Sequence, residues 1–258
     1  MKKLMMMIAM LCLGVVAGCS SNGMTVEDLE EKGTLVVGLS ADYPPFEFHK
    51  MIDGVDTIVG FDVMLAEEIA KELDVNLEIS EMKFDGLIGA LQAGHVDMVI
   101  SGMTPDETRA KAVDFSDLYY NGLQGVLVSD ANVSVLKSGD DLKDKAIGAQ
   151  MGSVQSALAK ELSTNVKELA KTQDLVLELS NGNLDAVIVG SEIAKRYADE
   201  FDGVSLSDID LPTDEGMAVT MMKNSPELVE KVNEIIKSLK ESGKLDEMLE
   251  EAINLMNE

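Results

Sequence analysis

Residues 83–102 read KFDGLIGALQAGHVDMVISG, and residues 171–190 read KTQDLVLELSNGNLDAVIVG, with eight of the twenty aligned positions identical. In each stretch, apolar residues at helical spacing run up to a glycine, Gly94 or Gly182, and a short continuous apolar run follows. A glycine at that place can end a helix in the left-handed conformation, so the pattern predicts a helix, a turn and a buried parallel strand. Because one copy lies in each half of the chain, the repeat predicts two similarly built α/β lobes. The alternative is that two unrelated helix–strand units share these residues for structural reasons alone.

Other apolar runs between turn residues predict further strands. Amphipathic segments predict a helix from Phe61 to Leu73, one that starts at Ser225-Pro226, and one from about Lys244 to Leu255. This alternation favours right-handed crossovers and ligand sites at the carboxyl ends of strands. The predicted strands are Thr34–Leu39, Asn76–Ser80, Val96–Ser101, Gln124–Val128, Ala146–Gln150, Ala186–Val189 and Ala218–Met222.

The composition is strongly acidic, with 21 Lys and Arg residues against 47 Asp and Glu residues and a net charge of −26. A nucleic-acid-binding surface needs many cationic side chains to neutralise phosphates, so this balance argues against such a partner. The hydrophobic share of 46% nevertheless predicts a packed core, which must be largely aliphatic because the chain has no tryptophan.

The N-terminus has the layout of a secretory signal. Lys2 and Lys3 precede an apolar stretch, Leu4–Val16, that is too short to span a bilayer. The following residues, Val-Ala-Gly-Cys at 16–19, resemble the bacterial lipobox, in which cleavage falls before an acylated cysteine. The alternative is an uncleaved anchor helix.

From this layout we expect residues 1–18 to be removed as a signal peptide and Cys19 to carry the lipid, palmitate included. Residues 19–25 would then form a short tether, and no disulfide is expected because Cys12 leaves with the signal. The protein is therefore expected to be extracytoplasmic and lipid-anchored to the cell membrane.

Two predicted strand ends carry groups that suit a carboxylate. After residues 96–101, Thr104 and Glu107 have capping-box spacing around Pro105, which predicts a helix start whose free amides attract an anion. Arg109 follows and could form a bidentate pair with a carboxylate. After the strand at 146–150, Ser153 is a candidate helix cap whose amides face the same way. Each residue also has a purely structural interpretation: a surface ion pair with Asp106 or Asp114 for Arg109, and a plain cap for Ser153.

Five blocks of the chain, in order, resemble the extracytoplasmic amino-acid-binding proteins of ABC importers, which have the type 2 periplasmic-binding-protein fold. The blocks are ADYPPFEF, VGFDVMLAEEIAKEL, FDGLIGALQAGHVDMVISGMT, ETRAKAVDFSDLYY and SPELVEKVNEIIKSLKESGKL, within residues 30–250. The resemblance implies an α/β fold of two lobes, each a mostly parallel sheet flanked by helices, joined by two crossing strands near 122–128 and 211–222. Lobe 1 would hold residues 26–122 and 216–258, and lobe 2 residues 123–215.

The resemblance also implies how the ligand carboxylate is bound. It would pair with Arg109, with Thr104 and the backbone of Ser101 and Gly102 beside it. Ser153 would offer a hydroxyl and an amide to the same carboxylate from the second lobe.

An aromatic loop follows the first predicted strand, at residues 40–48 (SADYPPFEF). Two prolines stiffen this loop, which suits the wall of a ligand site, although a packed surface turn is the alternative. The resemblance places Tyr43 from this loop, and Phe84, on the aromatic walls around the ligand side chain.

Two positions depart from the family pattern. Gly190 stands where the family usually has the acid that pairs with the ligand's α-ammonium, which leaves Glu192 or the carbonyl of Ser101 as substitutes. Ser40 stands where the family often has another acid, and Asp42 lies two residues later. These departures leave open a ligand that lacks a standard α-amino group.

The expected function is capture of an L-amino acid, on which the lobes close so that an ABC permease recognises the closed form. The acidic composition mildly favours neutral or cationic ligands, so we expect a polar or basic amino acid such as glutamine or arginine. A monomer is expected.

Two alternatives come from other functional classes: a dehydratase of a small carboxylic acid on the same fold, and a ligand-sensing module. His49 and His95 are expected to be solvated, and the sequence predicts no catalytic residue, no nucleophile–base pair, no metal cluster and no cofactor.

Overall fold

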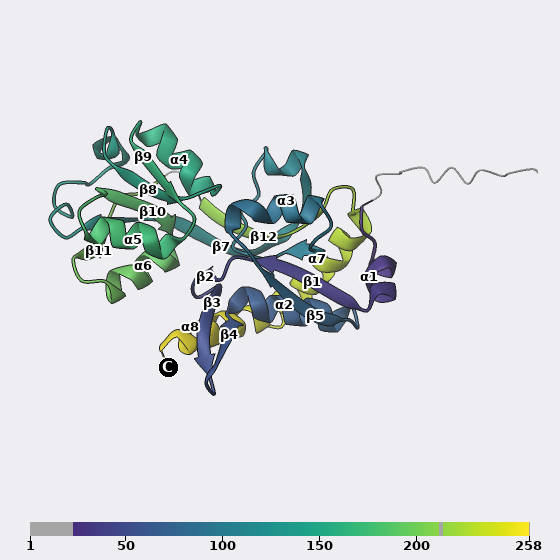
Figure 1. Ribbon diagram of the computed structural model, residues 1–258. Coiled ribbons are helices and arrows are strands. Elements are labelled where there is room, and N and C mark those ends of the chain that lie inside the picture. The colour runs from purple at the N-terminus through teal and green to yellow at the C-terminus, as the bar shows by residue number, and fades with distance from the viewer. Residues whose placement is uncertain (1–22, 212–213, 258) are drawn as a thin grey trace, which may run out of the picture.

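The computed structural model describes residues 23–211 and 214–257. The predicted signal peptide at 1–18 and the lipidation of Cys19 therefore lie outside the described residues. Figure 1 shows two α/β bodies joined by two long strands, β7 (Val113–Ser129) and β12 (Asp214–Met222). Among the helices of the described residues, none has the length and apolarity that a membrane crossing requires.

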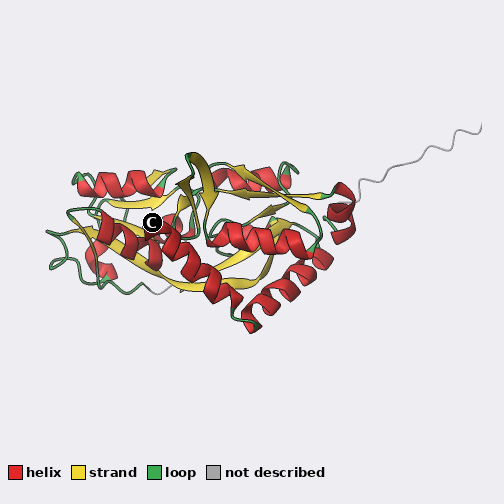
Figure 2. Ribbon diagram, turned by 90° about the horizontal axis from the view of Figure 1, so that it is seen from below, coloured by secondary structure: helices red, strands yellow, loops and turns green. Residues whose placement is uncertain are grey.

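The first body is built on the sheet order β5-β1-β6-β12-β7. Helices flank this sheet, and a small hairpin sheet, β2-β3-β4, lies beside it (Figure 2). Its remaining elements are α1 (Val26–Lys32), β1 (Thr34–Leu39), β2 (Asp42–Tyr43), β3 (Glu47–Ile52), β4 (Val55–Val59), α2 (Phe61–Glu72), β5 (Asn76–Glu81), η1 (Phe84–Gly86), α3 (Leu87–Gln92), β6 (Met98–Val99), η2 (Arg109–Lys111), α7 (Pro226–Glu241) and α8 (Lys244–Asn257).

The second body continues the same sheet through β7-β10-β8-β9, with β11 beside β7. The parallel pairing of β8 with β9 and β10, and the antiparallel pairing of β7, make it a mostly parallel sheet. Its elements are η3 (Gly139–Leu142), β8 (Ile147–Gln150), α4 (Val154–Leu162), β9 (Val166–Leu169), α5 (Thr172–Ser180), β10 (Ala186–Gly190), α6 (Ser191–Glu200) and β11 (Val204–Leu206). The two-lobed α/β fold expected from the sequence is confirmed. The exact lobe boundaries, 26–122 with 216–258 against 123–215, stay a prediction.

The repeated sequence forms equivalent units in the two lobes. α3 ends before Gly94, at φ 71°, and β6 follows, whereas α5 ends before Gly182, at φ 74°, and β10 follows. Both glycines adopt the left-handed conformation that the sequence predicts.

The aspartate of the repeat accepts an equivalent backbone hydrogen bond in each lobe. Asp97 Oδ2 accepts a hydrogen bond of 2.7 Å from the N–H of Val36, and Asp185 Oδ2 accepts one of 2.9 Å from the N–H of Ala146. Each carboxylate thus ties the end of a helix–turn unit to the neighbouring strand.

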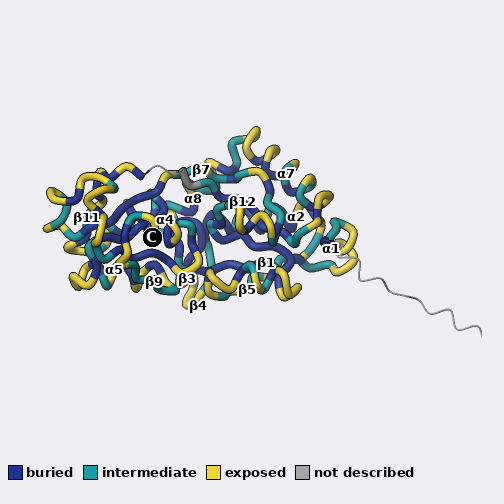
Figure 3. The backbone as a smooth tube through the Cα atoms, turned by 90° about the horizontal axis from the view of Figure 1, so that it is seen from above, coloured by how far each residue is buried: buried dark blue, intermediate teal, exposed yellow. Residues whose placement is uncertain are grey.

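The core follows the strands through both lobes, while the outer faces of the helices are exposed (Figure 3). Helix α2 shows why its sequence folds this way: Phe61, Leu65 and Ile69 recur every four residues and are at most 1% exposed. The residue before this helix must be a glycine. A Cβ at Gly60, which has a φ of 131°, would lie 2.3 Å from the carbonyl oxygen of Phe46.

Two predicted strands have different bounds in the structure. Val96–Ser101 is a strand only at Met98–Val99, although the N–H groups of Asp97 and Ile100 also donate to the backbone of β1. The predicted strand Gln124–Val128 is the second-lobe end of the 17-residue β7.

Candidate functional site

A small cavity lies where the carboxyl ends of β1, β6 and β8 meet between the lobes. Its volume is about 10 Å³, roughly the space of one water molecule. An amino acid therefore cannot enter unless the lobes move apart. The cavity is lined by Ser40, Asp42, Tyr43, Glu47, Phe84, Ser101, Gly102, Gln150, Ser153 and Gln155.

Hydrogen bonds join the lobes around this cavity. The hydroxyl of Tyr43 accepts a bond of 2.9 Å from the N–H of Gly190. Asp42 Oδ2 accepts bonds of 3.0 Å from the N–H of Thr172 and 3.2 Å from Nε2 of Gln150. The loop after β1 thus contacts three separate segments of the second lobe, and the structure is a closed form.

Arg109 lies between the lobes and is 8% exposed. Its guanidinium donates to the carbonyl oxygen of Thr104 and, at 2.8 Å, to that of Gly152 in the second lobe. Its Nε lies 3.3 Å from Asp106 Oδ2, and its Cζ lies 5.6 Å from the centre of the Phe84 ring. The ion pair with Asp106 considered from the sequence is present, but the arginine that makes it is buried.

The prediction that a helix starts at Thr104 and Pro105 is wrong. The chain is irregular there and forms only the short 3₁₀ turn η2. Asp106 Oδ1 accepts hydrogen bonds of 2.7 Å from the N–H of Thr108 and 2.9 Å from that of Arg109. A carboxylate that accepts from the amides two and three residues later makes the hydrogen bonds of a helix N-cap or an Asx turn, so Asp106 stabilises the short turn and occupies amides that an anion would need. The expected anion site at a helix N-terminus is therefore absent from this loop.

Ser153 caps α4 as the sequence predicts. Its Oγ accepts a hydrogen bond of 3.0 Å from the N–H of Ser156 and donates one of 2.7 Å to the carbonyl oxygen of Gln150. The Ser153 hydroxyl therefore caps α4, and Ser153 also lines the wall of the small cavity.

The structure brings the predicted site residues together around two adjoining spaces. Thr104, Arg109 and Ser153 line a hollow of about 810 Å³ between the lobes, and Gly190 contacts Tyr43 as described above. Their role in ligand binding stays a prediction. Those that line the small cavity are Tyr43, Phe84, Ser101, Gly102 and Ser153.

Sequence reasoning missed a pair of buried acids, Glu47 on β3 and Asp62 on α2, which are 1% and 0% exposed. Ser101 Oγ donates to Glu47 Oε1 at 2.8 Å. Asp62 Oδ2 accepts from the N–H of Gly102 at 2.7 Å and from the hydroxyl of Tyr119 at 2.9 Å. The two residues are distant in sequence, and no motif spacing marked them as partners.

Burial controls the charges at this site. It raises the pKa of Glu47 well above the usual range, with repulsion from Asp62 as the next cause, and it raises the pKa of Asp62 and of Asp42. Burial also lowers the pKa of Arg109, which stays charged because an arginine starts so high. The small cavity is thus lined by the acids Asp42 and Glu47, while Arg109 lies in the adjoining hollow.

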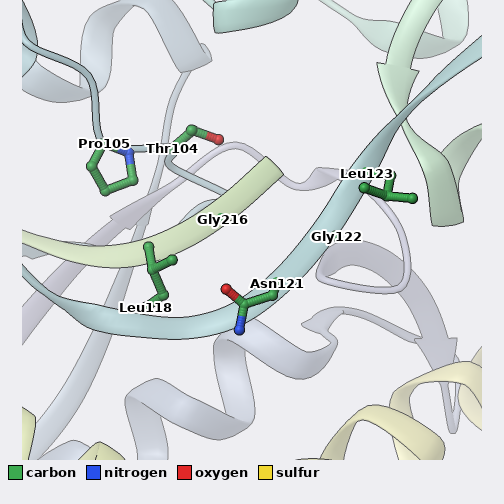
Figure 4. Close-up of a pocket in the computed structure, with 7 residues that line it drawn as sticks. All are labelled: Thr104, Pro105, Leu118, Asn121, Gly122, Leu123 and Gly216. Carbon is green, nitrogen blue, oxygen red and sulfur yellow. The ribbon is translucent and has the colours of Figure 1, made fainter. Parts of the chain in front are cut away.

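A second hollow, of about 560 Å³, lies against the two crossing strands (Figure 4). In this view Leu118, Asn121 and Leu123 follow β7, Gly216 lies on β12, and Thr104 and Pro105 belong to the neighbouring loop. Gly216 pairs with Asn121 in the strand register, so the hollow sits where the chain passes between the lobes. Gly122 completes its lining.

Comparison with known families gives a match over residues 35–254 to the bacterial extracellular solute-binding proteins, family 3. The chain belongs to this family. The resemblance to amino-acid-binding proteins of ABC importers that was drawn from the sequence blocks is thereby confirmed.

Two similar proteins are named as binding proteins for an amino acid or a transporter substrate. The arginine-binding extracellular protein ArtP of Bacillus subtilis is 35% identical over 257 residues, which cover 96% of each chain. The solved structure of AbpA from Streptococcus pneumoniae, bound to L-arginine, superimposes with a TM-score of 0.85 at 39% identity and covers 89% of this chain and 98% of that one.

One further solved structure bears on the enzymatic alternative. The ancestral amino-acid-binding protein AncCDT-1, a precursor of cyclohexadienyl dehydratase, has a TM-score of 0.79 at 35% identity and covers 88% of this chain and 98% of that one. All three of these similar proteins are named for binding rather than for catalysis.

Proposed function

We propose that the amino acid this family 3 protein captures is L-arginine. The observation that carries the proposal is the charge of the cavity wall. Among the described residues that line it, Asp42 and Glu47 are acidic and none is basic, and the buried Asp62 adds a third acid that acts on the charge of Glu47. An amino acid with a cationic side chain brings two positive groups to meet them, whereas a neutral amino acid brings one.

The partners of Asp42 support this assignment. They are neutral donors, namely Ser40 Oγ at 2.9 Å, the N–H of Thr172 and the amide of Gln150. Among the described residues, the one positive charge found to act on Asp42 is that of Lys171, and its effect is the smallest of the contributions. A buried carboxylate without a strong cationic partner is costly, and a ligand guanidinium would remove that cost.

In this proposal Arg109 binds the ligand carboxylate. Its contacts with Thr104, Gly152 and Asp106 account for three of its five N–H groups, within the described residues, and leave one on each terminal nitrogen. Tyr43 and Phe84 would flank the ligand side chain, and Ser101, Gly102, Ser153 and Gly190 would complete the wall. Both lobes contribute, so the ligand stabilises the closed form.

We further propose the cellular context that the sequence indicates. The protein would be anchored through a lipid on Cys19, act as a monomer and present its closed form to an ABC permease. It would perform no reaction on the amino acid. The similar proteins ArtP and AbpA support the arginine assignment, because each is named for or solved with that amino acid.

A thermal-shift screen of the purified protein tests the ligand. L-Arginine at about a hundredfold over its dissociation constant should add about 2.7 kcal/mol of stability and raise the melting temperature by about 5–10 °C. L-Lysine should give a smaller shift, and L-glutamine and L-glutamate smaller still. Agmatine, which is arginine without its carboxylate, is the matched control and should not shift the melt. A larger shift with glutamine or glutamate than with arginine would refute the assignment.

A further inference from the structure

We propose that Glu47, through a proton that it shares with Asp62, tunes the site for a cationic amino acid, and that entry of the cationic group releases this proton. The affinity for arginine would then rise with pH. The inference rests on the proposed function, because it concerns the same cavity and the same class of ligand.

The first step is the hydrogen bonding of the pair. Glu47 Oε2 and Asp62 Oδ1 are fully buried, and within the described residues neither has a hydrogen-bond partner. The two carboxyl groups also raise each other's energy when both are charged, because burial and the repulsion from Asp62 raise the pKa of Glu47. Two buried carboxylates that lack a cation cannot both ionise readily, so the pair holds a proton. Asp62 already accepts from Gly102 and Tyr119, which assigns the negative charge to Asp62 and the proton to Glu47.

The second step concerns the surroundings of the pair. The groups that act on its charge in the described part of the chain are acidic or neutral: Asp42 on β2, Tyr119 on β7, and the donors Ser101 and Gly102 beyond β6. No lysine, arginine or histidine is among them. Within the described residues, no cation is thus placed to ionise Glu47, and the proton is retained.

The third step is the position of Glu47 on the cavity wall. Glu47 lines the cavity while Asp62 lies behind it, so a ligand's ammonium or guanidinium group would approach Glu47 first. A positive group next to Glu47 favours the ionised carboxylate and lowers the pKa of the pair. The O–H bond of Glu47 breaks, the electron pair stays on its oxygen, and the proton passes to water.

The sign of the pH dependence follows from this linkage. Protonation of the pair competes with the cationic ligand, so binding is weakest at low pH, where the proton is held most firmly. The affinity should rise by up to about one decade per pH unit as the pH passes through the raised pKa of the free pair, then level off. At most one proton leaves per ligand bound.

Calorimetric titration of L-arginine into the protein tests this proposal. The titration is run from about pH 5.5 to about pH 8.5 in pairs of buffers that differ in ionisation enthalpy, since the difference in observed enthalpy counts the protons released. We expect fractional proton release and a dissociation constant that falls as the pH rises. An affinity that is independent of pH, with equal enthalpies in both buffers, overturns the proposal and leaves the arginine assignment intact.

The matched variant is Glu47→Gln. Its amide can donate to Asp62 and accept from Ser101, so it imitates the protonated side chain at every pH. At every pH tested, we expect Glu47→Gln to bind arginine as weakly as the wild type does at low pH. We also expect it to release no proton. If this variant still releases a proton, the proton comes from another group and the proposal is overturned. If the variant does not fold, the two-buffer titration of the wild type still decides.

His49→Gln is the control for surface titration. His49 lies on the outer hairpin between Asp56 and Glu81, and its hydrogen bond with Glu81 raises its pKa, so it also titrates in this range. This control should keep the wild-type proton release. Loss of the release in His49→Gln rather than in Glu47→Gln would contradict the role of Glu47. A failure of the underlying function looks different, because arginine would then not bind at any pH.

Discussion

Arg109 Nη2, in the first lobe, donates a hydrogen bond of 2.8 Å to the carbonyl oxygen of Gly152, in the second lobe. The arginine predicted to hold the ligand carboxylate thus joins the lobes directly. Its bond to Thr104 and its ion pair with Asp106 fix the guanidinium from the first lobe as well. A side chain held on both sides pays little further ordering entropy when a ligand arrives.

Removal of this guanidinium should nearly abolish binding. Arg109→Ala leaves a buried ligand carboxylate unpaired, which costs about 2–5 kcal/mol, a loss of roughly 30-fold or more in affinity. Arg109→Lys should also weaken binding, because a point charge cannot reproduce the planar fork. Calorimetric titration of L-arginine measures both. Arg196→Ala is the control, since Arg196 pairs with Glu200 on α6. An Arg109→Ala variant with wild-type affinity would exclude this residue as the carboxylate partner.

Asp42 should decide between cationic and neutral ligands. Asp42→Asn removes a charge-assisted hydrogen bond worth about 1.5–3 kcal/mol, so the dissociation constant for arginine should rise by about tenfold or more. Competition titrations with arginine and glutamine measure the ratio of the two affinities, which should shift toward glutamine. Asp53→Asn, on the exposed tip of the β3–β4 hairpin, is the control. An equal loss for both ligands would mean that Asp42 only holds the lobes together.

The hydroxyl of Tyr43 should stabilise the closed form. Tyr43→Phe leaves the buried N–H of Gly190 without its acceptor when the lobes close, at a cost of about 1–3 kcal/mol. The ligand-free variant should therefore be more open and bind arginine more weakly. Small-angle X-ray scattering measures the radius of gyration, which should increase relative to the wild type. Tyr197→Phe, which packs against Phe201 within the second lobe, should leave the radius unchanged. No increase in Tyr43→Phe would show that this contact does not govern closure.

The repeated aspartates should differ in their contribution to stability. Asp97 is 3% exposed and binds Lys32 Nζ through both oxygens, at 2.7 and 2.9 Å, in addition to the N–H of Val36. Asp185 binds the N–H of Ala146, a bond that an asparagine oxygen can keep. Asp97→Asn should cost about 1–3 kcal/mol of the free energy of unfolding and Asp185→Asn less. Urea denaturation measures both, and the reverse order would contradict this interpretation of the repeat.

The sequence predicted what depends on local patterns. The glycines at 94 and 182 and the apolar runs after them specified the helix–turn–strand units, and Ser153 was recognised as a cap. Those features are decided by neighbours within a few residues, which is the range that periodicity and capping rules cover. The family pattern then supplied the two-lobed arrangement.

What the sequence could not predict depends on distant contacts or on local competition. Thr104 and Glu107 have the spacing of a capping box, yet it is Asp106 that accepts from the amides of Thr108 and Arg109, and the chain forms only the short 3₁₀ turn η2. Glu47 and Asp62 lie on different elements, and only the packing of β3 against α2 brings their carboxyl groups together. Neither carboxyl carries a local signal that would distinguish it from the other acids of this acidic chain.

The most direct test of the central claim is a crystal structure of the protein with L-arginine. The account predicts the ligand between the lobes, with its carboxylate about 2.7–2.9 Å from the terminal nitrogens of Arg109 and its guanidinium beside Asp42. A ligand bound with its carboxylate away from Arg109, while that side chain keeps only its present contacts, would contradict the account.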